Sequence, residues 1–298
     1  MSPVIKKLVV AGGAHMGFSY FGALKTLSER KFFTMANIDT IYATSVGTIL
    51  AVFLSLQCDW KTLEEYLVNR PWKRIFPTNL RNALMAVPKG GLFDISTVEK
   101  ILEPVLLDRD LSLDTTLQEF YDYNKKDMHF ITTLYEPLTM VDLSHKTHPE
   151  WRLVDAVYAS ACLPVLFVPY CRNTNETYLD GAMYDNYPID QCLKNSKIDE
   201  VLGVSFNHSE AEPMMHNKSP LRLFFFLLDF ISKVLRLLKN EPSIESKRAP
   251  YQMEIEGDSR FHEALEVISS TAKRREMIKR GEISAIHFLE SIQFHESI

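Results

Sequence analysis

Two short stretches place a nucleophile and a carboxylate directly after strand-like segments. The first, "YATSVGTIL" (42–50), sets Ser45 between small residues, with an apolar run before it and a helix-like run after it. This is the spacing of a Gly-x-Ser-x-Gly elbow, although Ala43 stands where the first glycine would be and Gly47 keeps the second. The other stretch, "TYLDGA" (177–182), ends a strand at Asp180-Gly181 and exposes a carboxylate at a tight turn. A serine hydroxyl needs such a base before it can attack an ester.

A glycine-rich turn precedes both stretches. Residues 4–17, "VIKKLVVAGGAHMG", indicate a buried strand, a turn and the start of a helix. The N–H groups of such a turn lie at the positive end of the helix dipole, which suits either a phosphate or the oxyanion of acyl transfer. The Gly-x-Gly-x-x-Gly spacing and a Walker lysine are both missing, which argues against a nucleotide. A turn that simply requires glycine is the remaining alternative.

A histidine base is the other possibility for activating the serine. The order Ser…Asp…His of the α/β-hydrolases could be filled by Ser45, Asp180 and His208. Only two strands precede Ser45, however, whereas the nucleophile of an α/β-hydrolase follows several. The other histidines of the downstream chain lie in polar loops or in a charged helical tail. The sequence also lacks a His/Cys/Asp cluster with ligand spacing, so we expect no metal and no cofactor.

Alternating strand-like and helix-like segments must position these residues. The first fifty residues predict strand, helix, strand and helix, which indicates parallel strands covered by helices on both faces. Further along, residues 129–135 and 138–144 predict two strands around a Glu-Pro turn, and Ser96 and Glu99 predict a capping box for a helix over 96–107. The remaining helices are expected at 62–70 and 152–162, and the remaining strands at 165–170, 177–182 and 200–206.

Composition favours one globular domain over residues 1–298. Hydrophobic residues make up 46% and charged residues 24%, and the net charge of −5 gives no reason to expect nucleic-acid binding. Four scattered cysteines form no CxxC pair, and the first apolar run is too short for a signal peptide, so we expect a cytoplasmic protein. The least regular part is expected at 207–260, with a helical segment at 261–295.

The most hydrophobic run is "SPLRLFFFLLDFISKVLRLLKN" (219–240). Asp229, Lys233 and Arg236 interrupt it, so it does not predict a transmembrane helix. As an amphipathic helix over 220–239 it could lie in a lipid interface, form a lid over an acyl-binding cleft, or cover an edge of the sheet. The basic stretch "KRREMIKR" (273–280) could face anionic lipid if it lies on the same side.

Five segments in the same order and spacing carry a resemblance to a known family. They are "GGAHMGFSYFGAL" (12–24), "ATSVG" (43–47), "GLFD" (91–94), "ASACLPVLFVP" (159–169) and "DGAMYDNYP" (180–188). Over residues 5–205 this pattern resembles the patatin-like phospholipases. The resemblance implies a three-layer α/β/α fold with a mainly parallel central sheet. It also implies a Ser–Asp dyad without histidine, in which Ser45 is the nucleophile and Asp180 the base.

The resemblance assigns the remaining site residues as well. The oxyanion hole is expected at Gly12, Gly13 and Ala14, the elbow includes Ala43 and Gly47, and the other motif positions are Gly17, Gly181 and Ala182. Ala43 and Ala14 replace family glycines, and Met16 stands where the family usually has Arg or Lys.

The implied function is that of a lipid acyl hydrolase of the phospholipase A type, acting on a phospholipid or another acyl lipid through an acyl-enzyme. A neutral-lipid lipase or acyltransferase with the same dyad is an alternative, and so is a non-catalytic lipid-binding protein. Contact with a membrane surface through 220–239 would be peripheral.

Overall fold

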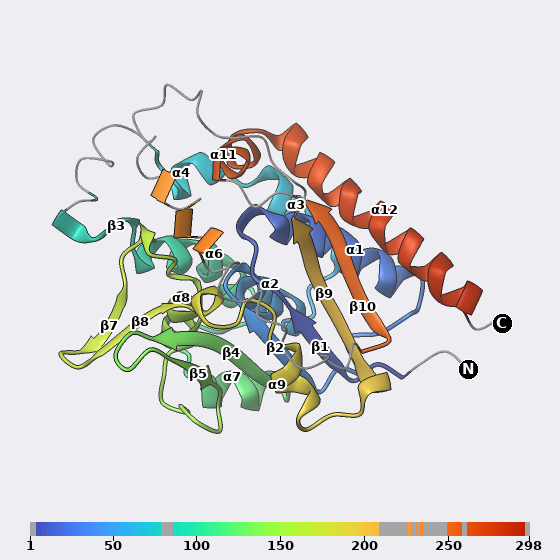
Figure 1. Ribbon diagram of the computed structural model, residues 1–298, viewed down its shortest axis with the longest axis horizontal. Coiled ribbons are helices and arrows are strands. Elements are labelled where there is room, and N and C mark those ends of the chain that lie inside the picture. Colours follow the sequence, from blue (N-terminus) through green and yellow to red (C-terminus); the bar gives the residue numbers. More distant parts are fainter. Residues whose placement is uncertain are drawn as a thin grey trace.

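A single large mixed sheet organises the part of the chain that the computed structural model describes, namely residues 4–78, 86, 88–208, 226–227, 230–231, 233–234, 249–257 and 261–295. The strand order is β10-β9-β1-β2-β4-β8-β7, and β5 also pairs with β4 (Figure 1). The strands are β1 (Lys7–Val10), β2 (Thr40–Thr44), β4 (Asp127–Leu134), β5 (Thr139–Leu143), β7 (Tyr170–Asn173), β8 (Glu176–Asp180), β9 (Val201–His208) and β10 (Tyr251–Gly257).

The centre of this sheet is parallel and one end is antiparallel. From β10 through β9, β1 and β2 to β4, all neighbours run parallel, whereas β5, β8 and β7 pair antiparallel. The mainly parallel sheet of the predicted fold class is therefore confirmed. A separate two-stranded sheet joins β3 (Gly91–Phe93) to β6 (Val165–Phe167).

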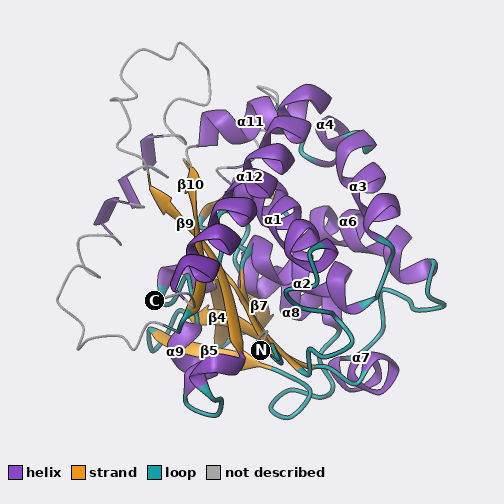
Figure 2. Cartoon of the chain, turned by 90° about the vertical axis from the view of Figure 1, so that its right-hand side faces the viewer, coloured by secondary structure: helices purple, strands orange, loops and turns teal. Residues whose placement is uncertain are grey.

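Helices cover both faces of the sheet, but unequally. The helices are η1 (Ala14–Met16), α1 (Gly17–Glu29), α2 (Val46–Ser55), α3 (Trp60–Asn69), α4 (Trp72–Ile75), α6 (Ile95–Leu107), α7 (Leu117–Asn124), α8 (Leu153–Ala161), η2 (Gly181–Met183), α9 (Ile189–Leu193), η3 (Ile198–Glu200), α11 (Phe261–Ser269) and α12 (Thr271–His295). Figure 2 shows most of them on one side of the sheet and α9 on the other.

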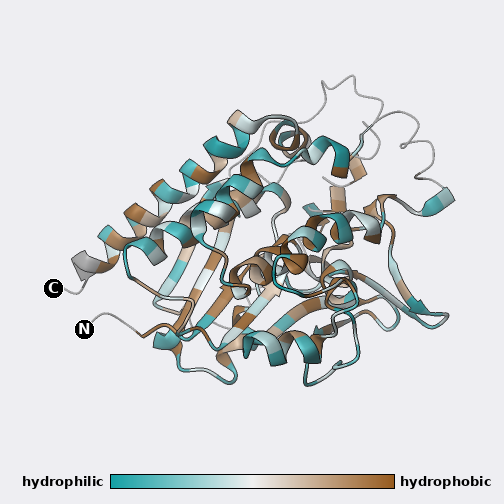
Figure 3. Cartoon of the chain, turned by 180° about the vertical axis from the view of Figure 1, so that it is seen from behind, coloured by the Kyte–Doolittle hydropathy of each residue, from teal (hydrophilic) through white to brown (hydrophobic). Residues whose placement is uncertain are grey.

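Burial on both sides of β1 explains this layering. Leu8 and Val10 pack into the main core under the helices, whereas Val9 faces a second cluster with Tyr42 of β2 and Ile189 of α9. Strands buried on both faces are typical of parallel sheets in α/β proteins. Figure 3 shows the same division by hydropathy, with apolar residues in the strands and central helices and many hydrophilic residues along α12.

The structure corrects three local predictions. Residues 251–257, expected to be irregular, form β10, with Met253 and Ile255 buried on one side. The cap of α6 is Asp94, whose side chain accepts the N–H of Ser96, and not the predicted capping box of Ser96 and Glu99. The strand predicted over 165–170 is divided between β6 and β7.

The amphipathic segment 220–239 lies mostly outside the described residues. The described residues of this segment, at 226–227, 230–231 and 233–234, are helical. Within the described parts of the chain, no helix has both the length and the apolar character needed to cross a bilayer.

Candidate active site

Ser45 occupies a sharp turn between β2 and α2. Its backbone has φ 55° and ψ −127°, a conformation that residues other than glycine rarely adopt. The first turn of α2 lies so close to β1 that a Cβ on Gly47 would come within 2.5 Å of the Val10 carbonyl oxygen. Ala43 is buried in the main core, which accommodates its methyl group. The turn therefore has the strained strand-to-helix geometry of a nucleophile elbow, with the glycine required at 47 and not at 43.

Asp180 contacts Ser45 directly from the end of β8. The Ser45 hydroxyl donates to Asp180 Oδ2 over 2.7 Å. The other carboxylate oxygen, Oδ1, accepts the N–H of Ala182 over 2.8 Å, and the side chain of Thr133 donates to the Asp180 carbonyl over 3.0 Å. Asp180 is 2% exposed. Its carboxylate is thus buried and held in one orientation, with no room for an imidazole between it and the serine.

The histidine of the alternative triad is His208, at the end of β9. His208 is the last residue of this strand, and its side chain lies outside the described part of the chain.

Ser160, in α8, holds the elbow in place and was not assigned a role from the sequence. The Ser45 N–H donates to the Ser160 hydroxyl over 3.0 Å, and that hydroxyl donates in turn to the Ile131 carbonyl of β4. Ser160 is fully buried. The sequence shows only a serine within the stretch "ASACLP" (159–164), and nothing in that stretch indicates its partner.

Two of the three residues predicted for the oxyanion hole line the cavity at the glycine-rich turn. The Gly12 N–H donates to the Asn186 carbonyl over 3.0 Å, so it is already used. Gly13 is the N-cap of η1 and Ala14 is its first residue, and the first N–H groups of a helix have no acceptor within that helix. Gly13 and Ala14 both line the cavity that contains Ser45 and Asp180, whereas Gly12 does not. Both have positive φ, 156° at Gly13 and 48° at Ala14.

Tyr20 and Asn186 fix the peptide of Gly12. The Tyr20 hydroxyl donates to the Gly12 carbonyl over 2.9 Å, and burial holds the pKa of Tyr20 well above its ordinary value, so it remains a neutral donor. Asn186 also packs closely, because a Cβ on Gly12 would lie 2.4 Å from its Oδ1. The segment that follows Asp180 therefore braces the glycine turn, which links the two halves of the site.

The other predicted motif positions have packing roles. A Cβ on Gly17 would lie 2.7 Å from Val46 Cγ2, and one on Gly181 would lie 2.1 Å from the Ile131 carbonyl oxygen. Met16 is fully buried in the main core and does not line the cavity, although its neighbour His15 does. The position at which the sequence lacks a cation is thus a core position in this protein.

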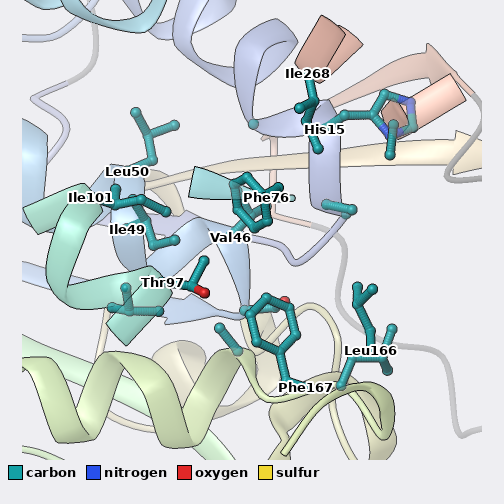
Figure 4. Close-up of a pocket in the computed structure, with 18 of the residues that line it drawn as sticks. His15, Val46, Ile49, Leu50, Phe76, Thr97, Ile101, Leu166, Phe167 and Ile268 are labelled. Atoms are coloured by element: carbon teal, nitrogen blue, oxygen red, sulfur yellow. The ribbon is translucent and has the colours of Figure 1, made fainter. Parts of the chain in front are cut away.

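A cavity of about 470 Å³ opens beside Ser45 and extends into the helical layer. Figure 4 shows Ile49, Leu50 and Ile101 gathered at one end of it and Leu166 and Phe167 at another. Its polar lining is confined to a few groups, which include Ser45, Asp180, Thr97 and Asn186, and most of the remaining wall is apolar. This size and lining are typical of a site for a small or medium apolar ligand with a few orienting polar groups.

Comparison with known proteins gives one consistent picture. The model of the family "Patatin-like phospholipase" matches residues 8–193. The chain is 26% identical over 191 residues to the "Probable lipid hydrolase 463L" of Invertebrate iridescent virus 6. The matched region makes up 63% of this chain and 63% of the viral protein, so the chain matches less than two thirds of the length of the viral protein.

Solved structures share the fold at low identity. VipD from Legionella pneumophila has a TM-score of 0.57 at 18% identity, over 97% of this chain and 67% of VipD. The type III effector ExoU has a TM-score of 0.50 at 12% identity, over 97% of this chain and 53% of ExoU. Because the family model covers more than half of the chain, the protein belongs to the patatin-like phospholipase family.

Proposed function

We propose that the protein hydrolyses the acyl ester bonds of lipids with Ser45 as nucleophile and Asp180 as its only side-chain base. The 2.7 Å contact between Ser45 Oγ and Asp180 Oδ2 carries this proposal. Family membership and the viral relative described as a probable lipid hydrolase support the substrate class. The apolar cavity beside Ser45 provides a place for an acyl chain.

In the first half-reaction, Asp180 accepts the Ser45 hydroxyl proton while Ser45 Oγ attacks the ester carbonyl carbon. The N–H groups of Gly13 and Ala14 stabilise the oxyanion, and loss of one such donor typically costs about 3–4 kcal/mol of transition-state stabilisation. The tetrahedral intermediate then expels the alcohol, which takes the proton back from Asp180. An acyl-Ser45 ester remains.

In the second half-reaction, Asp180 accepts a proton from water and the resulting hydroxide attacks the acyl-enzyme. Ser45 Oγ leaves and recovers the proton, which releases a fatty acid. One dyad thus serves both half-reactions, as general base and then general acid.

The phospholipase A type of reaction has a direct test. Purified protein is incubated with vesicles that contain both phosphatidylcholine and triacylglycerol, and the products are identified by mass spectrometry. We expect lysophospholipid and free fatty acid in equal amounts from the wild type and none from Ser45→Ala. Formation of diacylglycerol instead of lysophospholipid would contradict the phospholipase A assignment.

A neutral-lipid lipase or acyltransferase is the second candidate, and one observation favours it. The described cavity lining contains no lysine or arginine, and Met16 is buried away from it, so no fixed cation is available there for a phosphodiester. The same vesicle experiment, repeated with glycerol as an added acceptor, separates release of fatty acid from transfer of the acyl group.

The protein is further proposed to act peripherally at a lipid surface. Phe226 and Phe230, in the predicted amphipathic segment 220–239, are 59% and 55% exposed, and their rings stack with centroids 6.3 Å apart. Exposed aromatic residues on one helical face favour insertion into the interface of a membrane. The double variant Phe226→Ser/Phe230→Ser should lose binding to vesicles in a flotation assay while soluble short-chain esters are still hydrolysed. Unchanged flotation would contradict this role.

A further inference from the structure

From the shape of the cavity we propose that α2 acts as a ruler for one linear acyl chain and that Phe53 sets its length limit. This inference rests on the proposed function, because it places the acyl group of an ester at Ser45. It adds which residues select the substrate and in which direction the chain runs.

One part of the cavity lining is a face of α2. Val46, Ile49, Leu50 and Phe53 all line it, at the i, i+3, i+4, i+7 spacing of a single helical face. Because α2 begins directly after Ser45, this face leads away from the nucleophile. At 1.5 Å per residue, the distance along the helix from Val46 to Phe53 is roughly 10 Å.

A second part of the cavity lining is a continuous series of aromatic rings. Each ring contacts the next, with centroid distances of 6.0 Å for the first pair and then 6.3, 5.2 and 5.5 Å, and all of them line the cavity. In order, the residues are Phe18, Trp72, Phe76, Phe93 and Phe167. A cavity lined by a helical face and by a series of packed rings suits a single extended chain better than a branched or polycyclic acid.

The lining residue farthest along α2 is Phe53, which belongs to the buried core, as does Ile101. Phe53 is 1% exposed and Ile101 is 2% exposed. Phe53 is also held by the ring of Tyr66, with centroids 5.7 Å apart and planes at 82°. A chain that extends past Ile49 and Leu50 therefore meets Phe53, which cannot move aside without disturbing packed neighbours.

Chain-length dependence follows from this geometry. Each additional methylene buried along α2 should raise kcat/KM about fourfold, since burial of one CH₂ contributes roughly this factor. The rise should stop at the chain length that reaches Phe53. The Phe53→Leu variant should move this break to longer chains, and Ile49→Phe, nearer to Ser45, should move it to shorter ones.

The experiment measures dissociation constants of linear fatty acids, from butyrate to stearate, by calorimetry on Ser45→Ala protein with and without each second substitution. The hydrolysis of the corresponding nitrophenyl esters is measured on proteins that retain Ser45. The control is Phe120→Leu, because Phe120 is 2% exposed in the same core but does not line this cavity. It should leave the break where it is in the wild type.

Opposite shifts in Phe53→Leu and Ile49→Phe, with no shift in Phe120→Leu, support the ruler. A break at the same chain length in all variants, or a continuous rise without a break, overturns it. If the fatty acids show the break but no ester is hydrolysed, the ruler holds and the proposed hydrolytic function fails. If esters are hydrolysed without a movable break, the function holds and the ruler fails.

Discussion

The main-chain N–H of Ser45 shows how the nucleophile depends on a residue from a distant part of the chain. Its acceptor is the hydroxyl of Ser160, 115 positions later, and that hydroxyl is itself held by the carbonyl of Ile131. A backbone with positive φ persists only if its surroundings hold it there. Ser160 is therefore a positioning residue for the elbow.

The Ser160→Ala variant tests this role. It leaves the Ser45 N–H and the Ile131 carbonyl without their partner in a buried site, which should cost about 1–3 kcal/mol of unfolding free energy. We expect kcat to fall with little change in KM, because the elbow shifts while the cavity remains. Urea unfolding and ester kinetics measure the two effects.

Ser55→Ala is the matched control for that variant. Ser55 is a buried serine in α2 whose hydroxyl donates to Val52, away from the elbow. Its loss should lower stability without the specific fall in kcat. Equal kinetic effects of the two variants would mean that Ser160 contributes stability alone.

At the scale of elements, the contact between β1 and α2 decides which elbow position needs glycine. The sequence shows alanine at 43 and glycine at 47 but cannot show which of them lies against a neighbouring backbone. In the structure, Gly47 lies against the Val10 and Ala11 carbonyls, and Ala43 fills part of the core. This asymmetry explains why the family-like motif tolerates a methyl group at only one of its two small positions.

We expect Gly47→Ala to lose several kcal/mol of stability or to fail to fold, since its Cβ would force α2 away from β1. Ala43→Gly should cost only about 1 kcal/mol and keep most of the activity. Thermal unfolding followed by circular dichroism, together with ester hydrolysis, compares the pair. The reverse order of sensitivity would contradict the packing described at the elbow.

Sequence patterns indicated most of the elements, and the exceptions have physical causes. The buried strands and amphipathic helices around Ser45 and Asp180 carry their own periodic signal. β10 is an edge strand that alternates Met253 and Ile255 with glutamates, and it follows a long segment without a clear pattern. The residue that caps α6 is Asp94, which precedes both residues of the predicted capping box, Ser96 and Glu99. Its side chain accepts the Ser96 N–H, so it takes the role that the prediction gave to Ser96.

The partners of site residues were harder to predict than the residues themselves. The ordered motifs brought Ser45, Asp180 and the glycine turn into one hypothesis because their residue types are chemically distinctive. The use of the Gly12 N–H by Asn186 could not be predicted, since a backbone hydrogen bond between distant segments leaves no trace in composition or spacing.

At the scale of the whole molecule, a charged cluster stabilises the end of the sheet opposite the active site. His129 of β4 contacts Asp142 over 2.7 Å and Asp127 over 3.3 Å, and its ring stacks on Tyr42 with centroids 4.0 Å apart. Burial alone would lower the pKa of His129, but the hydrogen bonds to Asp127 and Asp142 outweigh burial and raise that pKa to about 9.

This raised pKa makes folding stability depend on pH. Because the folded state holds the proton more tightly than the unfolded state, the stabilisation by His129 is fully present below the ordinary pKa of 6.5. It should be lost as the pH rises from there through about 9. Urea midpoints across this range should fall for the wild type and change much less for His129→Gln. The exposed His287 offers a control, and His287→Gln should keep the wild-type profile.

The central claim is that Ser45 is a nucleophile activated by an aspartate without a histidine. Covalent labelling by a fluorophosphonate probe, with the modified peptide identified by mass spectrometry, tests it most directly. We predict labelling at Ser45 in the wild type and in His208→Ala, none in Ser45→Ala, and a strong loss in Asp180→Asn with its fold intact. Labelling of Ser45→Ala at the wild-type rate, or labelling that requires His208 and not Asp180, would contradict the account.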